Sequence, residues 1–312
     1  MNKKATIAMS GGVDSSVAAL LMKEQGYDCI GVTMKLFRNE DIGVPREHSC
    51  CSLDDVEDAR SVAYKLGIPY YVFNFSDRFR EEVIDRFVCA YENGRTPNPC
   101  IDCNRYLKFD KLYQRASELG CDCVATGHYA RIERDETSGR YLLKKAVDAD
   151  KDQSYVLYSM SQEQLAHTRF PLGGMTKPEV RRIAEAQGFV NARKHDSQDI
   201  CFVQDGNYSG FIEQHTGKKY PEGNFIDTSG NILGRHRGII HYTVGQRKGL
   251  GLAFAAPMYV CAVNAEDNTV TLGRNDELFS KKLIAKDINL ISRASIYEPL
   301  RVKAKIRYRQ AE

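Results

Sequence analysis

Short apolar runs alternate with longer amphipathic runs along the first 126 residues of the chain. The apolar runs predict buried strands over residues 6–9, 28–34, 69–73 and 121–126. The amphipathic runs predict helices that end at Gly26, Gly67, Gly94 and Leu119, and Ser52 with Asp55 forms a capping box for the second of them. Strands that alternate with helices predict an α/β fold with a doubly wound parallel sheet.

The pattern changes beyond Tyr129. A hairpin is expected over residues 129–146, followed by short helices near 154–160, 162–168 and 177–187. After Gly206, glycines separate short β-type runs, and residues 258–273 and 300–309 alternate between apolar and polar side chains. We therefore expect domain boundaries near residues 205 and 280, which divide the chain into an α/β domain (1–205) and two β-rich domains (206–280 and 281–312).

The first apolar run stops at a turn that contains two adjacent glycines, Gly11 and Gly12. Glycines let a backbone turn sharply and approach a ligand closely, and the helix that follows directs its free N–H groups at the turn. This arrangement predicts a phosphate site, with hydroxyl donors from Ser10, Ser15 and Ser16 and a carboxylate, Asp14, that can reach a magnesium ion. An ordinary strand–turn–helix would explain one glycine but not this group of residues.

Ligands of doubly wound sheets bind beyond the carboxyl ends of the strands. Met34 and Gly127 follow two other predicted strands and are candidates for the floor beneath an adenine and a ribose, although core packing would also explain Met34. The 312 residues carry a formal charge of +3, so any nucleic-acid contact must come from local basic patches. No run approaches the ~20 apolar residues of a membrane span. Ten cysteines without a signal peptide favour reduced thiols in the cytoplasm.

Three of these cysteines stand apart from the others. Cys100 and Cys103 lie in a rigid loop over residues 94–104 that contains two prolines and precedes a helix from Tyr106, and Cys103 is expected at or near the N-terminus of that helix, which favours the thiolate. Cys201 lies in a polar stretch after Lys194 and His195. Cys50 and Cys51 are undecided, and the remaining cysteines are interpreted as small buried hydrophobic residues: Cys29, Cys89, Cys121, Cys123 and Cys261.

The sequence Ser10-Gly11-Gly12-Val13-Asp14-Ser15 resembles the pyrophosphate loop of the N-type ATP pyrophosphatases and lacks the lysine and spacing of a Walker A loop. Members of that superfamily cleave ATP between its α and β phosphates and activate a carbonyl-type oxygen as its adenylate. The resemblance implies ATP and Mg²⁺ as cofactors, bound by Ala8, Met9, Ser10, Gly11, Gly12, Val13, Asp14, Ser15, Ser16, Met34 and Gly127.

Further motifs narrow the resemblance to the tRNA 2-thiouridylases and cover nearly the whole chain. They are residues 94–99, 125–129, 150–155, 199–202 and 242–251. The resemblance implies thiolation of C2 of a wobble uridine in tRNA. Cys201 would carry a persulfide supplied by a sulfur-relay donor protein or a cysteine desulfurase, and Cys103 would release the sulfur, leaving a Cys103–Cys201 disulfide.

One departure from the family leaves the chemistry open. Many relatives have an aspartate, the proposed general acid/base, where this chain has Cys100. The three thiols Cys100, Cys103 and Cys201 match instead the ligand count of a [4Fe-4S] cluster with one open iron. The persulfide and iron–sulfur routes therefore both stand, and zinc on the same thiols is a third option.

The best local signal for nucleic acid is the segment from Arg301 to Arg309. If it forms a strand, its five basic residues share one face and its apolar residues the other, which suits binding to phosphates. By resemblance, residues 281–312 begin a C-terminal β-barrel that is incomplete in this sequence. The expected tRNA contacts are Asn98, Pro99, His128, Lys151, Asp152, Gln153, Arg307, Tyr308 and Arg309. Two alternatives remain: an adenylating amide ligase without sulfur transfer, and a non-enzymatic metal- or RNA-binding module.

Overall fold

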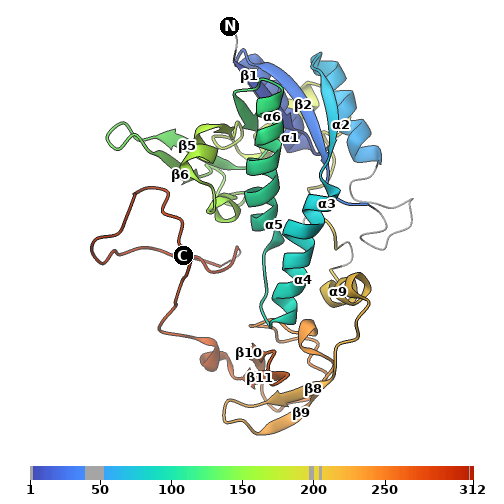
Figure 1. Cartoon of the computed structure of the whole chain (residues 1–312), viewed down its shortest axis with the longest axis vertical. Coiled ribbons are helices and arrows are strands. Elements are labelled where there is room, and N and C mark those ends of the chain that lie inside the picture. The colour runs from blue at the N-terminus through green and yellow to red at the C-terminus, as the bar shows by residue number, and fades with distance from the viewer. Residues whose placement is uncertain (1–2, 39–52, 197–199, 204–205, 309) are drawn as a thin grey trace.

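The computed structural model describes residues 3–38, 53–196, 200–203, 206–308 and 310–312. Its centre is a parallel sheet of five strands in the order β3-β2-β1-β4-β7 (Figure 1). The predicted α/β fold is therefore confirmed. The strands are β1 (Lys4–Ala8), β2 (Asp28–Lys35), β3 (Tyr70–Asn74), β4 (Cys123–Ala125) and β7 (Thr168–Arg169).

Most of the helices that connect these strands lie close to the predicted positions. The helix expected from Tyr106 begins instead at Pro99, because proline is tolerated in the first turn of a helix. The capping box at Ser52 lies outside the described residues, and two helical stretches contain π-helical segments, η2 and η3, within them. The helices of this part are α1 (Val13–Glu24), α2 (Leu53–Leu66), α3 (Ser76–Phe79), η2 (Arg80–Ile84), α4 (Asp85–Glu92), α5 (Pro99–Asp102), η3 (Cys103–Lys111) and α6 (Leu112–Glu118).

A hairpin and three short helices lie beside β4. The hairpin pairs β5 (Ala130–Arg134) with β6 (Tyr141–Lys145), as expected. Helix α8 begins with a capping box between Thr176 and Glu179 and has a proline in its first turn, both of which stabilise a helix start. The short helices are η4 (Ser154–Leu157), α7 (Gln162–Ala166) and α8 (Lys177–Ala186).

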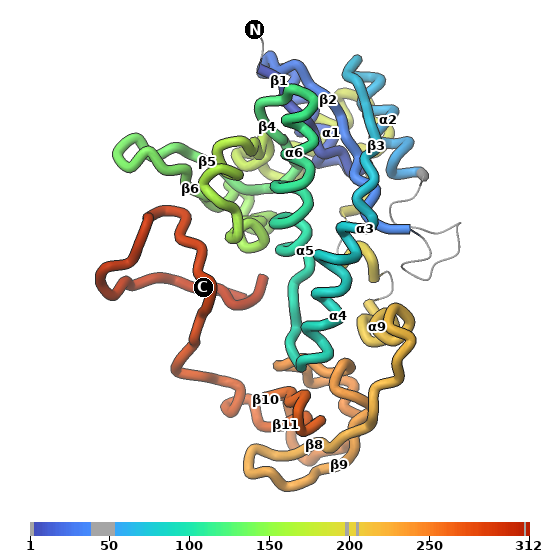
Figure 2. The backbone as a smooth tube through the Cα atoms, in the orientation of Figure 1, coloured from blue at the N-terminus to red at the C-terminus, as the bar shows by residue number. Residues whose placement is uncertain are grey.

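A second, four-stranded sheet follows helix α9 (Tyr208–Thr216), with the order β10-β11-β8-β9. It lies at the opposite end of the molecule from β1 (Figure 2). Its elements are β8 (Gly223–Ile226), β9 (Ile232–His236), η5 (Ile239–His241), β10 (Tyr259–Asn264), β11 (Thr269–Gly273) and η6 (Asn275–Leu278). Within the described ranges, no helix combines the length and apolar character needed to cross a bilayer.

The predicted basic strand over residues 300–309 is wrong. None of the described residues after Leu278 lies in a helix or strand, and Val302 is 76% exposed. A strand needs a neighbour to take up its backbone hydrogen bonds, and no described strand pairs with this segment. The chain after Leu278 instead runs back toward β5 and β6 (Figure 1), where Arg140 donates to the carbonyl oxygens of Leu290 and Ile291 at 3.0 Å each.

Candidate active site

The glycine turn joins β1 to α1 at the carboxyl edge of the sheet. Gly11 adopts φ +75°, a conformation that side chains rarely tolerate, and a Cβ there would lie 2.3 Å from the carbonyl oxygen of Asp55. The Ser15 and Ser16 hydroxyls donate to the carbonyl oxygen of Gly12 at 3.0 and 3.1 Å. The backbone N–H of Ser10 donates to Ser15 Oγ at 3.2 Å. The turn is therefore folded tightly around the start of α1.

Two residues from other elements support this turn. A Cβ on Gly127 would lie 2.8 Å from the backbone of Asp14 and Ser15, so Gly127 lets the chain after β4 pack directly on the start of α1. Asn191 is buried, and its amide donates to the Gly11 carbonyl oxygen at 2.8 Å and to Ser16 Oγ at 2.9 Å. Free N–H groups at a helix start, held in one geometry, suit phosphate.

Ala8 and Met9 end the strand before the turn. The Met9 side chain is buried, its N–H donates to Val32 at 2.8 Å, and its carbonyl oxygen accepts from Thr33 at 2.6 Å. Met9 therefore belongs to the core beneath the turn. Met34 is half-buried and packs against the core that contains Cys103.

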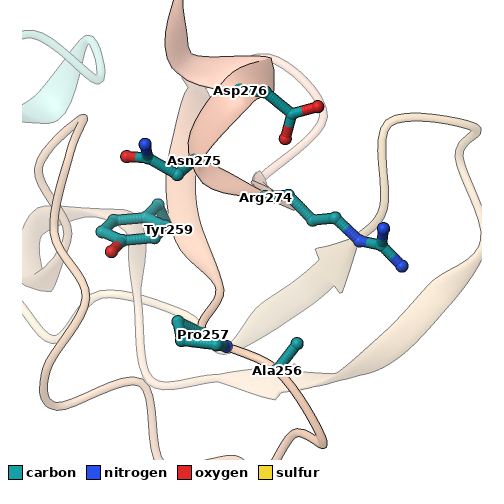
Figure 3. Close-up of a pocket in the computed structure, with 6 residues that line it drawn as sticks. All are labelled: Ala256, Pro257, Tyr259, Arg274, Asn275 and Asp276. Atoms are coloured by element: carbon teal, nitrogen blue, oxygen red, sulfur yellow. The ribbon is translucent and has the colours of Figure 1, made fainter.

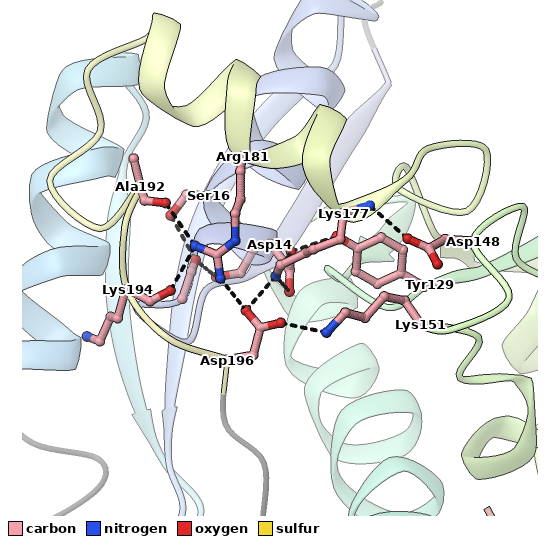
Figure 4. Close-up of polar contacts among 12 residues, drawn as sticks. Asp14, Ser16, Tyr129, Asp148, Lys151, Lys177, Arg181, Ala192, Lys194 and Asp196 are labelled. Atoms are coloured by element: carbon pink, nitrogen blue, oxygen red, sulfur yellow. Dashed lines mark hydrogen bonds and ion pairs between the residues drawn. The ribbon is translucent and has the colours of Figure 1, made fainter. Parts of the chain in front are cut away.

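A cluster of charged side chains lies beside the turn (Figure 4). The Lys177 ammonium donates to both oxygens of Asp14 at 2.7 Å and pairs with Asp196 at 2.7 Å, and Tyr129 donates its hydroxyl to Asp14 at 2.8 Å. Lys151 and Arg181 also donate to Asp196, at 2.8 and 2.9 Å. Burial alone would raise the pKa of Asp196, but the hydrogen bonds from Lys151 and Lys177 lower this pKa to about 2. Asp196 is therefore ionised at neutral pH.

The sequence pattern did not single out Lys177, Asn191 or Asp196. Lys177 was recognisable only as the first residue of a predicted helix, and Asp196 only as part of the polar stretch before Cys201. The contacts of Lys177 and Asn191 with the turn join residues more than 160 positions apart, and Asp196 reaches Lys151 across 45 positions; no local pattern reports such contacts.

The three thiols occupy different environments. Cys100 is exposed in the first turn of α5, where its N–H donates to Asn98 at 3.1 Å. Cys103 is only 8% exposed and belongs to a large hydrophobic cluster. Cys201 is exposed, and the neighbouring Phe202 packs in that same cluster. Cys103 and Phe202 therefore belong to one hydrophobic cluster.

The expectation of a thiolate at Cys103 is not met. The helix begins at Asn98, so Cys103 lies a full turn inside it, and burial raises the pKa of the thiol to about 11. Burial outweighs the nearby positive charge of Lys108, which acts to lower the same pKa. Within the described ranges, no three histidine, cysteine or acidic side chains are arranged to hold a metal. The three thiols therefore do not form a ready iron–sulfur or zinc site.

The residues expected to contact tRNA are dispersed, and several have structural partners. Asn98 caps α5 and Pro99 is buried. His128 is buried against Phe109 and Phe170, and burial followed by the charge of Lys108 lowers its pKa well below the usual value. Asp152 accepts from the N–H of Ala146 at 3.0 Å, and Gln153 accepts from the N–H of Tyr129 at 2.9 Å, so both stabilise the local chain. Lys151 belongs to the charged cluster described above.

The last three expected contacts are at the end of the chain. Arg307 donates to the carbonyl oxygen of Val244 at 2.8 Å, and the Tyr308 ring lies 6.2 Å from that of Tyr155. Arg309, like Cys50 and Cys51, lies outside the described residues. An open pocket of about 520 Å³ lies in the second sheet (Figure 3), and no predicted site residue lines it.

Comparison with known proteins identifies the family. Residues 3–205 match the family model described as tRNA methyl transferase HUP domain, and residues 209–274 match the tRNA methyl transferase PRC-barrel domain. The chain is 58% identical over 308 residues to the tRNA-specific 2-thiouridylase MnmA of Clostridioides difficile, covering 99% of this chain and 85% of the relative. The chain belongs to the tRNA-specific 2-thiouridylase family.

A second relative agrees with this assignment. The 2-thiouridylase MnmA of Acetivibrio thermocellus is 56% identical over 311 residues, which is 99% of this chain and 87% of the relative. A solved 4-thiouridine synthetase–RNA complex with bound ATP is 18% identical and covers 69% of this chain and 50% of its own, at a TM-score of 0.43. The two relatives named 2-thiouridylase, by their identity and coverage, confirm the family expected from the sequence motifs.

Proposed function

We propose that this chain thiolates C2 of the wobble uridine in tRNA, with ATP and Mg²⁺, through an adenylated uridine. The observation that carries the proposal is the near-complete coverage of the chain by relatives named tRNA-specific 2-thiouridylase. The glycine turn supports it, because a tight turn with free helix N–H groups suits the phosphates of ATP. Asp14, held at the same place by Lys177 and Tyr129, is the carboxylate that would meet the magnesium ion.

The proposed chemistry starts from a poor electrophile. The C2 oxygen of uridine is a poor leaving group, so it attacks the α phosphate of ATP and displaces pyrophosphate. The outer sulfur of a persulfide on Cys201 then attacks C2, and AMP leaves with the oxygen. This forms a C2–S–S–Cys201 adduct in which the new sulfur is still bound to the enzyme.

Cys103 would complete the transfer. Its thiolate attacks Cys201 Sγ, the S–S bond of the adduct breaks, and the thiouridine sulfur leaves with the electron pair. The product is a Cys103–Cys201 disulfide, which an external thiol must reduce before the next turnover. Burial raises the pKa of Cys103, so this thiol is mostly protonated at neutral pH in the protein without tRNA. A sulfur-relay donor protein or a cysteine desulfurase would supply the persulfide, and the cytoplasm provides the reducing thiols.

The iron–sulfur route has less support. It needs Cys100, Cys103 and Cys201 around one cluster, whereas Cys103 is buried and the other two are exposed. Purification without oxygen, followed by iron and acid-labile sulfide analysis, separates the two routes. Protein without iron that still thiolates tRNA supports the persulfide route.

We also propose that the chain is organised as an ATP domain (1–205), a central β-rich domain (206–280) and a third segment (281–312). The two family models end and begin close to the first boundary. Contacts with tRNA are assigned to the loop at Asn98 and Pro99 and to the charged residues Lys151 and Arg307.

A substitution series tests the function. Wild-type protein, ATP, a persulfide donor and unmodified tRNA should give 2-thiouridine, AMP and pyrophosphate. Cys201→Ser should abolish thiolation and leave ATP binding unchanged. The matched control is Cys89→Ser. Cys89 was expected to be buried, but it is exposed on α4, outside the proposed site. A Cys201→Ser enzyme that still thiolates tRNA would sink the proposal, and amide formation by that variant would favour a ligase.

A further inference from the structure

The carboxylate of Asp196 lies in the charged cluster beside the glycine turn. It is surrounded by three cations, Lys151, Lys177 and Arg181, at 2.7 to 2.9 Å (Figure 4). Lys177 is shared between Asp196 and Asp14 of the glycine turn. One ammonium group thus joins the phosphate turn to the segment that leads to Cys201.

Among the described residues, Asp196 is the ion-pair partner of Lys151 and Arg181 and one of the two partners of Lys177. Three cations face two carboxylates, Asp14 and Asp196, and the carboxylate of Asp148 is occupied by the N–H of Lys177 at 2.8 Å. The Lys177 side chain is 8% exposed, so its charge is held mainly by these carboxylates and the Tyr129 ring. Removal of Asp196 would leave Lys151, Arg181 and part of Lys177 without an anion.

The donors around Asp196 would also suit a phosphate in place of the carboxylate. Lysine and arginine donors that converge on a pair of oxygens bind carboxylates and phosphates alike. Arg181 also donates to the backbone oxygens of Ala192 and Lys194, at 3.2 and 3.1 Å. The segment 192–196 is therefore held against α8 through the same guanidinium group that binds Asp196.

We propose that Asp196 is a displaceable counter-anion, which occupies this cationic cluster in the nucleotide-free protein and yields it to the polyphosphate of ATP. The inference rests on the proposed function, because it requires ATP at the glycine turn. Asp196 precedes Cys201 by five residues, a chain of at most ~18 Å. On the other side of Cys201, the ring of Phe202 packs against those of Phe87 and Phe211, with centroid distances of 5.3 and 5.1 Å. Nucleotide binding would thus loosen one of the attachments of the Cys201 segment.

The affinity for nucleotide tests the proposal, because displacement predicts that loss of the Asp196 charge makes binding tighter. Asp196→Asn removes the competing anion, so we expect Mg-ATP and inorganic pyrophosphate to bind at least about fivefold more tightly, the lower end of typical couplings. Asp196→Glu keeps the charge and should restore wild-type affinity. The matched control is Asp77→Asn, which removes an exposed carboxylate paired with Arg38 at 2.9 Å. Equal or weaker binding by a folded Asp196→Asn protein would overturn the proposal, because a carboxylate that merely organises the cations gives that result.

A second measurement uses wild-type protein and covers the case in which Asp196→Asn does not fold. Hydrogen exchange of the peptide 194–203 is followed with and without Mg-pyrophosphate. Displacement of Asp196 predicts faster exchange in this peptide when the ligand is bound, and slower or unchanged exchange contradicts it. A wild-type protein that binds no ATP would instead refute the proposed function, so the two failures are distinguishable.

Discussion

Substitution of Gly11 by alanine probes the geometry of the phosphate turn most directly. Two separate costs follow from the structure. The left-handed conformation at φ +75° costs a non-glycine residue roughly 1–2 kcal/mol. The added Cβ would also lie 2.3 Å from the Asp55 carbonyl oxygen, a backbone atom, and overpacking of this kind costs about 1–3 kcal/mol. Gly11→Ala should therefore lower the free energy of unfolding by about 2–5 kcal/mol.

Two glycines of the same region serve as matched controls. Gly26→Ala carries the conformational cost alone, because Gly26 has φ +83° and open space around its Cβ position. Gly12→Ala carries neither cost, since its φ is −87° and its nearest neighbour would be Ser10 Oγ at 3.5 Å. Urea unfolding followed by far-UV circular dichroism suits a chain that contains no tryptophan. Equal destabilisation by Gly11→Ala and Gly26→Ala would refute the reasoning, as would undiminished ATP binding by Gly11→Ala.

Three further predictions concern buried groups and the last segment of the chain. Because burial raises the pKa of Cys103 to about 11, its alkylation rate in the free protein should rise about tenfold per pH unit above neutrality, and a plateau below pH ~9 would contradict this. The pKa of His128 is lowered in the folded state, so its contribution to stability is present above pH ~6.5 and is lost as the pH falls. His128→Phe should therefore reduce the slope of the unfolding free energy against pH below ~6.5 by up to ~1.4 kcal/mol per pH unit. The same slope in wild type and variant would contradict this. Arg140→Ala removes the two hydrogen bonds that hold Leu290 and Ile291, each worth ~1.5–3 kcal/mol. The neighbouring Arg293 should then be cut by trypsin at least about tenfold faster than in wild type. An unchanged rate would be the contrary result.

Residue spacing was enough to predict the strand, turn and helix from Lys4 to Glu24, because each of these elements depends on neighbouring residues. Strand β7 has only two residues and joins the sheet through its pairing with β4, so no periodicity could reveal it. The basic strand was predicted from alternation alone, which does not guarantee a partner strand.

The site prediction is limited for the same reason: contacts between residues far apart in the chain leave no local sequence pattern. Cys103 was expected at a helix start but lies a full turn inside the helix, and its burial arises in a hydrophobic cluster that also contains residues of α3, α4 and the Phe202 segment. Lys177 and Asp196 become recognisable only when α8 and the segment before Cys201 meet the glycine turn. Local sequence thus pointed to the turn and the thiols as candidate sites, whereas the charged cluster beside the turn required the structure.

The central claim is that the nucleotide turn and the Cys103–Cys201 pair act on one uridine. A single turnover, with Cys201 loaded as a persulfide and external reductant omitted, tests this claim by mass spectrometry. The account expects AMP, 2-thiouridine and a Cys103–Cys201 disulfide in equal amounts. Formation of 2-thiouridine without AMP, or without that disulfide, would contradict it.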